Sequence, residues 1–190
     1  TDNEANNRDK DRNIINDRGG ALYFGGTGNL TIKSEITVLD IYGQSQIRTT
    51  EFTGNTASRG GAAYIEANGG TVNISDVSVS SNIGRDTGHD GSYSADEKWV
   101  SQGAGFWIGG STGNRATIEN ATFAGNKQSG LTTWGGGLYV ENIGLNLINT
   151  TFFMNAANHG GGIFINNADV SILNTTVAYN IATDNLHLGA

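Results

Sequence analysis

One short pattern occurs five times along the chain, and it limits the folds that the chain can adopt. Each copy is a glycine-rich step followed by an apolar, an aromatic and a second apolar residue. The segments are 22–24, 63–65, 106–108, 138–140 and 163–165, with Tyr23, Tyr64, Trp107, Tyr139 and Phe164 at their centres. Side chains alternate across a strand, so inward-facing apolar residues place the aromatic residues on the opposite face. We therefore expect a row of exposed aromatic side chains on one sheet.

A second motif recurs in step with the first. In each copy a large apolar residue is followed three positions later by asparagine. The pairs are Phe52 and Asn55, Val79 and Asn82, Phe123 and Asn126, Phe152 and Asn155, and Val177 and Asn180. The shortest spacings between these asparagines are 25, 27 and 29 residues. A period of this length with strand-like segments predicts a solenoid of β-strands.

The fold class predicted from these repeats is all-β, a right-handed parallel β-helix. We expect a single domain over residues 1–190, belonging to a longer solenoid, with about six turns of roughly 25 residues. Three short strands are expected in each turn, for example over 138–140, 144–148 and 151–153. The right hand follows from the general chirality of parallel crossover connections.

Composition narrows the possible functions. The chain of 190 residues has 29 glycines, no proline, no cysteine and a formal net charge of −7. Without a basic cluster, this charge argues against binding to nucleic acid or to anionic membranes. No apolar run reaches the roughly 20 residues that span a bilayer. We expect no cofactor and no metal, since the three histidines have no recognisable metal-ligand spacing.

A third row of residues stands three positions before each apolar anchor. Its members are Thr49, Asp76, Asn120, Asn149 and Asn174. Asparagine and aspartate tolerate left-handed backbone and bond to neighbouring backbone groups. We expect these residues to form turns that stack on one another, and thus to have an architectural role.

The two main motifs together resemble a known family. Gly19-Gly20-Ala21-Leu22, Gly60-Gly61-Ala62-Ala63 and Gly160-Gly161-Gly162-Ile163, with Phe-x-x-Asn beginning at Phe52, Phe123 and Phe152, are similar to the GGA(I/L/V) and FxxN repeats of chlamydial polymorphic membrane proteins. The resemblance covers residues 19–182. It implies a β-helical, surface-exposed passenger with an adhesive role.

Two rows are candidates for binding. The aromatic row offers a platform for a protein partner or for sugar rings, or it packs against another part of the chain. A second row, here called the corner row, precedes the glycine steps and consists of Arg18, Arg59, Gln102, Trp134 and His159. Its planar polar groups could hold an anionic chain or a sugar, or simply cover the surface.

Two segments interrupt the period, 34–46 and 83–102. The first is expected to add an apolar strand. The second is expected to form an inserted loop that contains Asp86, His89, Asp90 and Trp99. Long loops on rigid scaffolds often carry function. The carboxylates are candidate cation or substrate ligands, whereas the alternative is a solvated loop that folds over the scaffold.

Five Asn-x-Ser/Thr sequences are candidate glycosylation sites. They begin at Asn29, Asn73, Asn120, Asn149 and Asn174. In a eukaryotic source this density favours a glycoprotein, although turns rich in Asn-x-Thr also generate such sequences without selection.

The function predicted is that of a non-enzymatic extracellular or cell-surface module with a structural, adhesive or assembly role. Its expected partners are protein neighbours, including further copies in an oligomer or filament, or surface glycans. The alternative is a glycan-binding or polysaccharide-degrading protein that uses the 83–102 loop. Catalysis on such a scaffold needs clustered carboxylates on one sheet face, whereas the outward strand positions here are mostly aromatic or hydroxylic residues or asparagine.

Overall fold

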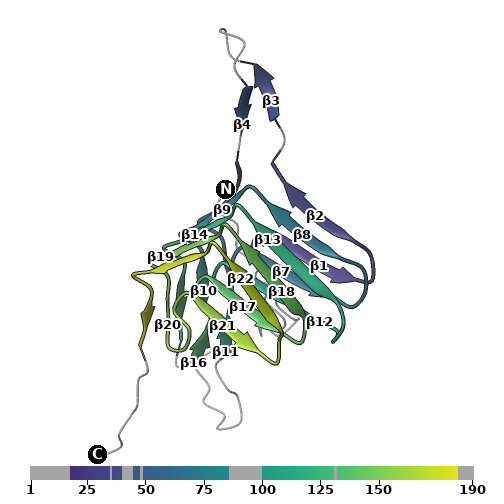
Figure 1. Cartoon of the computed structure of the whole chain (residues 1–190). Helices are drawn as coiled ribbons and strands as arrows, with labels where there is room; N and C mark the ends of the chain where they lie inside the picture. Colours follow the sequence, from purple (N-terminus) through teal and green to yellow (C-terminus); the bar gives the residue numbers. More distant parts are fainter. Residues whose placement is uncertain are drawn as a thin grey trace, which may run out of the picture.

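The computed structural model describes residues 18–34, 36–39, 45–47, 49–85, 100–130 and 132–183. Within these ranges the secondary structure is strand only, and no helix long and apolar enough to cross a membrane is found. Short strands lie side by side in stacked, mostly parallel sheets (Figure 1). The all-β prediction is therefore confirmed.

Four parallel sheets of five strands form the body of the molecule. Sheet 1 contains β1 (Leu22–Gly26), β7 (Ala63–Ala67), β12 (Phe106–Gly110), β17 (Leu138–Glu141) and β21 (Ile163–Asn166). Sheet 2 contains β2 (Leu30–Lys33), β8 (Val72–Ser75), β13 (Arg115–Glu119), β18 (Gly144–Ile148) and β22 (Val170–Leu173). Sheet 3 contains β5 (Thr50–Thr53), β9 (Val77–Ser80), β14 (Thr122–Ala124), β19 (Thr151–Phe153) and β23 (Thr176–Ala178). Sheet 4 contains β6 (Thr56–Ala57), β10 (Ile83–Arg85), β15 (Lys127–Ser129), β20 (Ala156–Ala157) and β24 (Ile181–Ala182).

Each structural repeat contributes one strand to each sheet, in the order 1, 2, 3 and 4. The strands expected over 138–140, 144–148 and 151–153 are present as β17, β18 and β19. The expected number of three strands per repeat is wrong, because sheet 4 adds a fourth. Its strands have only two or three residues and are rich in small side chains such as Ala156 and Ala157. They are too short to show the apolar alternation that identifies a strand. The described ranges contain five such repeats.

Two further pairs of strands lie outside the four sheets. In the second and third repeats, β11 (Val100–Gln102) pairs in parallel with β16 (Thr132–Trp134). In the first repeat, β3 (Ile36–Leu39) pairs with β4 (Ser45–Ile47) in the antiparallel sense. This hairpin projects away from the stacked strands (Figure 1). The 34–46 segment thus holds one whole strand and most of a second, where we had expected a single added strand.

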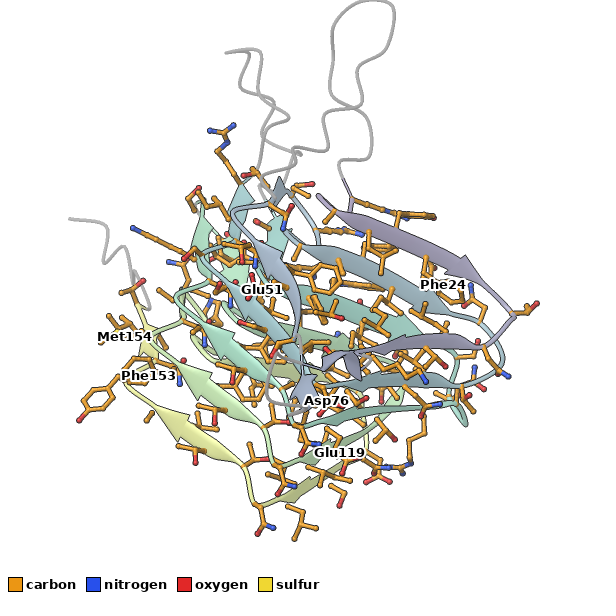
Figure 2. All side chains as sticks on the ribbon, turned by 90° about the horizontal axis from the view of Figure 1, so that it is seen from above. Phe24, Glu51, Asp76, Glu119, Phe153 and Met154 are labelled. Atoms are coloured by element: carbon orange, nitrogen blue, oxygen red, sulfur yellow. The ribbon has the colours of Figure 1, made fainter. Side chains whose placement is uncertain are left out.

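Side chains from the inner faces of the sheets fill the interior (Figure 2). In β8, β13 and β18 alternate residues are buried, as the strand period requires. At the corner after sheet 3, by contrast, Phe153 and Met154 point outward, and Met154 is 58% exposed. Each core position is shared by equivalent residues of successive repeats, as in the column formed by Val79, Phe123 and Phe152. The core is therefore built in layers, one for each repeat.

A row of buried asparagines runs along the corner between sheets 3 and 4. Its buried members are Asn55, Asn82, Asn126 and Asn155, and the half-buried Asn180 continues the row. The Asn126 Nδ2 donates to Asn155 Oδ1 at 2.9 Å and to the carbonyl oxygen of Val79 at 2.8 Å. The Asn126 Oδ1 accepts from the Nδ2 of Asn82 at 2.8 Å and from its backbone N–H at 3.1 Å. Each amide thus joins its own repeat to both neighbours, and Asn82 and Asn155 continue the pattern.

The glycine steps form the corner before sheet 1. Gly60 has a φ of 61°, and a Cβ there would lie 2.1 Å from the carbonyl oxygen of Ala63. The corresponding glycines of the other repeats, Gly19, Gly103, Gly135 and Gly160, also have positive φ values. Only glycine adopts this backbone without strain or collision. The recurrence of glycine therefore reflects a tight corner, repeated in each layer.

We expect Asn126→Ala to lower the free energy of unfolding by about 3 to 5 kcal/mol, because it leaves several buried polar groups without partners. Chemical denaturation measures the change. Asn73→Ala is the control, since Asn73 lies on an exposed strand position, and we expect it to change stability by no more than about 0.5 kcal/mol. Equal effects of the two substitutions would contradict a stabilising role for the buried row.

Gly60→Ala should lower the free energy of unfolding by about 2 kcal/mol or more, because alanine combines left-handed strain with a backbone collision. Gly26→Ala is the matched control, since a Cβ at Gly26 meets no atom within 4 Å. Thermal denaturation of both variants tests the prediction. A Gly60→Ala variant as stable as Gly26→Ala would show that this corner relaxes without cost.

Candidate functional site

The five residues of the aromatic row lie in register across sheet 1. Tyr23 pairs with Tyr64, Tyr64 with Trp107, Trp107 with Tyr139, and Tyr139 with Phe164. Their rings stack almost in parallel, with centroids 4.3 to 6.2 Å apart and interplanar angles of 5 to 11°. The row predicted from the sequence therefore exists, on the outer face of sheet 1.

The expected exposure of this row is wrong for its three central members. Tyr64, Trp107 and Tyr139 are 2%, 5% and 3% exposed, and only Tyr23 at one end is open, at 56%. Alternation along a strand correctly separates the aromatic residues from the main core. It does not reveal that other groups cover the outer face. These three rings form a second buried cluster, against which Trp134 and Phe164 pack.

The corner row supplies part of this cover. Its members are also in register, with Arg18 beside Arg59, Arg59 beside Gln102, Gln102 beside Trp134, and Trp134 beside His159. The Arg18 guanidinium carbon lies 4.8 Å from the ring centroid of Tyr64. Trp134 stacks on His159 at 6.0 Å and contacts Phe164 at 6.3 Å. The two rows predicted as separate candidate sites are therefore joined in one cluster.

A constant spacing could have revealed this contact. Each corner residue precedes the aromatic residue of its own repeat by five positions, with the glycine step between them. A tight corner bends the chain sharply between them, so residues on its two sides can meet over the outer face. Because the spacing is the same in each repeat, one such contact implies a row of them.

Burial changes the electrostatics of the row. Loss of solvent raises the pKa of Tyr64 to about 12, and the nearby Glu66 acts in the same direction. Arg18 and Arg59 act in the opposite direction. The Tyr64 hydroxyl donates to Glu66 Oε2 at 3.2 Å, and this carboxylate lies 3.8 Å from the Arg18 Nη1. Burial likewise raises the pKa of Tyr139. Both phenols are therefore held in their neutral form.

The indole N–H of Trp107 is buried and has no hydrogen-bond partner within the described part of the chain. The edge of the indole lies over Gly109, where a Cβ would come within 2.2 Å of its carbon atoms. Glycine at this position thus leaves room for the largest ring of the row.

Sequence reasoning missed a buried polar cluster where β11 and β16 widen the stack. The Gln128 amide, oriented to satisfy both of its ends, accepts from the N–H groups of Gly103 and Ala104 at 2.7 and 2.8 Å. Its nitrogen donates to Ser101 Oγ and to the carbonyl oxygen of Gly84. In a neighbouring contact, Thr133 Oγ1 donates to Asn158 Oδ1 at 2.7 Å. These bonds satisfy buried polar groups, which indicates a structural role.

A groove of about 630 Å³ lies at the corner between sheets 1 and 2. Its lining comes from segments 112–115, 142–144 and 167–169, together with Ile165. Arg115 donates to Asp169 Oδ2 and to Asn146 Oδ1, both at 2.9 Å. Asn167 Nδ2 donates to Asn142 Oδ1 at 2.7 Å. The polar groups of the groove therefore bond to one another across three repeats.

The turn row behaves as predicted over most of its length. Asp76, Asn120, Asn149 and Asn174 have φ values between 48° and 55°. Asn120 Nδ2 donates to Asp76 Oδ1 at 3.2 Å, and Asn149 Nδ2 donates to Asn120 Oδ1 at 3.3 Å. For Thr49, which follows a residue outside the described ranges, the turn stays a prediction. The row forms a chain of bonds along the corner between sheets 2 and 3.

The five candidate glycosylation sites all lie at exposed positions. Asn29 and Asn73 belong to the first two repeats, and Asn120, Asn149 and Asn174 belong to the turn row. Within the turn row, the amide bonds run along the surface of the stack rather than into the core. Glycosylation of these residues stays a prediction.

The candidate residues of the long insertion, Asp86, His89, Asp90 and Trp99, lie outside the described residues. The two ends of the predicted 83–102 loop are strands, β10 and β11, and belong to the stack itself. Across the described ranges no three histidine or acidic side chains gather as a metal site.

Comparison of the chain with family models, with curated proteins and with solved structures gave no match.

The raised pKa of Tyr64 predicts a loss of stability at high pH. The folded state holds the phenol proton more tightly than the unfolded chain does, in which tyrosine titrates near pH 10. The stabilisation is therefore complete below about pH 10 and is lost as the pH rises toward 12. Tyr64→Phe should flatten this part of the stability profile, measured by denaturation at stepped pH. An unchanged profile in the variant would contradict the buried, neutral phenol.

Proposed function

We propose that the chain is part of a right-handed parallel β-helix that acts as a rigid structural module, outside the cell or on its surface, with an adhesive or assembly role. One observation carries the proposal. The side chains that recur in each repeat, which are asparagine, aromatic, hydroxylic and planar polar groups, contact their equivalents in the repeats above and below. Such contacts stiffen a scaffold.

The β-helix assignment is supported by the order of the strands. The chain passes through sheets 1, 2, 3 and 4 and then returns to sheet 1 one strand further along. A parallel neighbour reached by such a path requires a coil around a common core. The right hand is supported by the general preference of parallel crossovers.

A structural role is supported by how much of the distinctive chemistry is used internally. The three central aromatic rings are buried, and Asn82, Asn126 and Asn155 have both ends of their amides bonded. In the groove, Arg115 and Asp169 pair with each other. These groups stabilise contacts between repeats, which favours a mechanical role over a chemical one.

Location at the surface is supported by the resemblance to the repeats of chlamydial polymorphic membrane proteins, in particular the Phe-x-x-Asn segments at Phe52, Phe123 and Phe152. The net charge of −7 and the exposed candidate glycosylation sites agree with such a location. The same features suit contact with protein neighbours or surface glycans.

Antibodies against the folded chain test this proposal on cells of the source organism. We expect equal labelling of intact and permeabilised cells, and loss of the label when intact cells are treated with protease. An antibody against a cytoplasmic protein is the control for membrane integrity. Labelling that appears only after permeabilisation would contradict a surface role.

A further inference from the structure

The corner between sheets 1 and 2 has a different length in successive repeats. Four residues connect β12 to β13 (111–114), two connect β17 to β18 (142–143), and three connect β21 to β22 (167–169). The short corner of the fourth repeat is therefore recessed between the longer corners of the third and fifth repeats. This recess is the groove of about 630 Å³, which has the usual size of a site for a small molecule.

The groove lies on the side of the stack. Its floor, Asn142 to Gly144, belongs to the fourth repeat, which has a repeat on either side. Among the lining residues Ile165 is different, because it shares the inward column of Val140, where a repeat beyond β21 would cover it. The polar lining lies on the corners, which a further repeat extends along the stack rather than covers.

Arg115 is held in a fixed position at the edge of the groove. Its guanidinium donates to Asn146 Oδ1 and to Asp169 Oδ2, both at 2.9 Å. It also lies over Gly144, where a Cβ would come within 3.1 Å of the guanidinium carbon. Glycine at this position thus leaves room for the guanidinium. A side chain that is already ordered loses little entropy when a ligand binds.

The internal bonds of the groove use only part of its polar atoms. Asp169 pairs through Oδ2, and its side chain is 87% exposed. Asn167 donates to Asn142 through Nδ2. In the described part of the chain, no further hydrogen bond is found for Asp169 Oδ1, Asn167 Oδ1 or Asn142 Nδ2. These atoms give the groove two acceptors and an amide donor for a ligand, beside the guanidinium of Arg115.

The charges of the groove favour a neutral ligand. Among its lining residues only Arg115 and Asp169 are charged, and they form a pair at 2.9 Å. An anion would be repelled by the carboxylate, and a cation would be repelled by the guanidinium. A neutral molecule with several hydrogen-bonding groups meets neither penalty.

A sugar has the hydrogen-bonding chemistry that this lining requires. Each of its hydroxyl groups both donates and accepts, as a serine hydroxyl does. Neighbouring hydroxyl groups can therefore bond to a carboxylate, an amide and a guanidinium that lie side by side. Hydrogen bonds to the two charged groups are the stronger ones.

From this chemistry we infer that the groove binds a neutral oligosaccharide. The side chains that hold it are Arg115, Asn142, Asn167 and Asp169. The inference rests on the proposed surface role and names one class of its partners, a glycan. The site differs from the sugar platform expected from the sequence, because the central rings of the aromatic row are buried.

The test uses the 190-residue chain, produced in a host that does not attach glycans, on an array of neutral and acidic oligosaccharides. We expect it to bind neutral oligosaccharides. Isothermal titration with the neutral oligosaccharide that binds best then measures the affinity of each variant. Circular dichroism and thermal denaturation verify that the variants fold.

Two substitutions remove polar groups of the site. Asp169→Asn should weaken binding about tenfold or more, because it removes a charged acceptor and the partner of Arg115. Asn167→Ala should weaken binding about fivefold, because it removes a neutral acceptor. The controls are Glu119→Gln, which changes the charge equally on β13, and Asn174→Ala, which replaces another asparagine of the fifth repeat with the same left-handed backbone. Both controls should keep the affinity of the unmodified chain.

Gly144→Ala tests the position of the guanidinium without changing any charge. The added Cβ displaces the Arg115 side chain, so binding should weaken about tenfold. Gly26→Ala is the control, since it adds a Cβ in open space at the same corner of the first repeat. It should leave the affinity unchanged.

Three results would overturn the inference. The first is a folded chain that binds no neutral oligosaccharide. The second is binding confined to acidic oligosaccharides, which would indicate recognition of anions by Arg115. The third is binding that the substitutions at Asp169, Asn167 and Gly144 leave unchanged, which would place the sugar elsewhere. Each result would leave the surface role open, because labelling of intact cells tests that role separately.

Discussion

The row of buried asparagines is the interaction on which the stack depends. A carbonyl or amide group that is buried without a hydrogen-bond partner costs about 1–3 kcal/mol. Each corner between sheets 3 and 4 buries several such groups. Asn82, Asn126 and Asn155 solve this problem with one side chain per repeat, because each amide accepts from the repeat before it and donates to the repeat after it. A shift of one residue between repeats would break these bonds and would also turn the core side chains outward. The row therefore sets the register of all four sheets.

Once the register is set, each position meets its own equivalent in the next repeat at the spacing of neighbouring strands, about 4.8 Å. Residues that interact well with their own kind are then favoured, such as stacked rings, hydroxyl groups and amides. Tyr64, Trp107 and Tyr139 illustrate this in sheet 1, and Asn120 and Asn149 do so in the turn row. The stacking of Arg18 on Arg59 is unfavourable by itself, because it places two positive charges next to each other. Arg18 lies over the Tyr64 ring and near Glu66, which offsets that repulsion.

The sequence predicted which residues stack on one another in successive repeats better than it predicted what covers them. Alternation and period placed the rings from Tyr23 to Phe164 on one face of one sheet, and placed Asp76 and Asn120 in left-handed turns. Both predictions need only local geometry and a constant repeat. The burial of Trp107 needed knowledge of what packs on the outer face, which local geometry does not contain. The strands of sheet 4 were missed because segments such as 156–157 are too short to show alternation. The role of Gln128 was missed because it occurs in one repeat only and has no periodic signal.

A stack of this kind divides its residues into two groups. In an inner repeat, each column residue has a partner above and below, so its hydrogen-bonding groups and its apolar surface are already in use. At an end, the same residue types keep one side uncovered, as the contrast between Phe152 at 0% and Val177 at 56% exposure illustrates. A residue type that recurs along a column therefore adds to the rigidity of the stack only where a neighbouring repeat covers it.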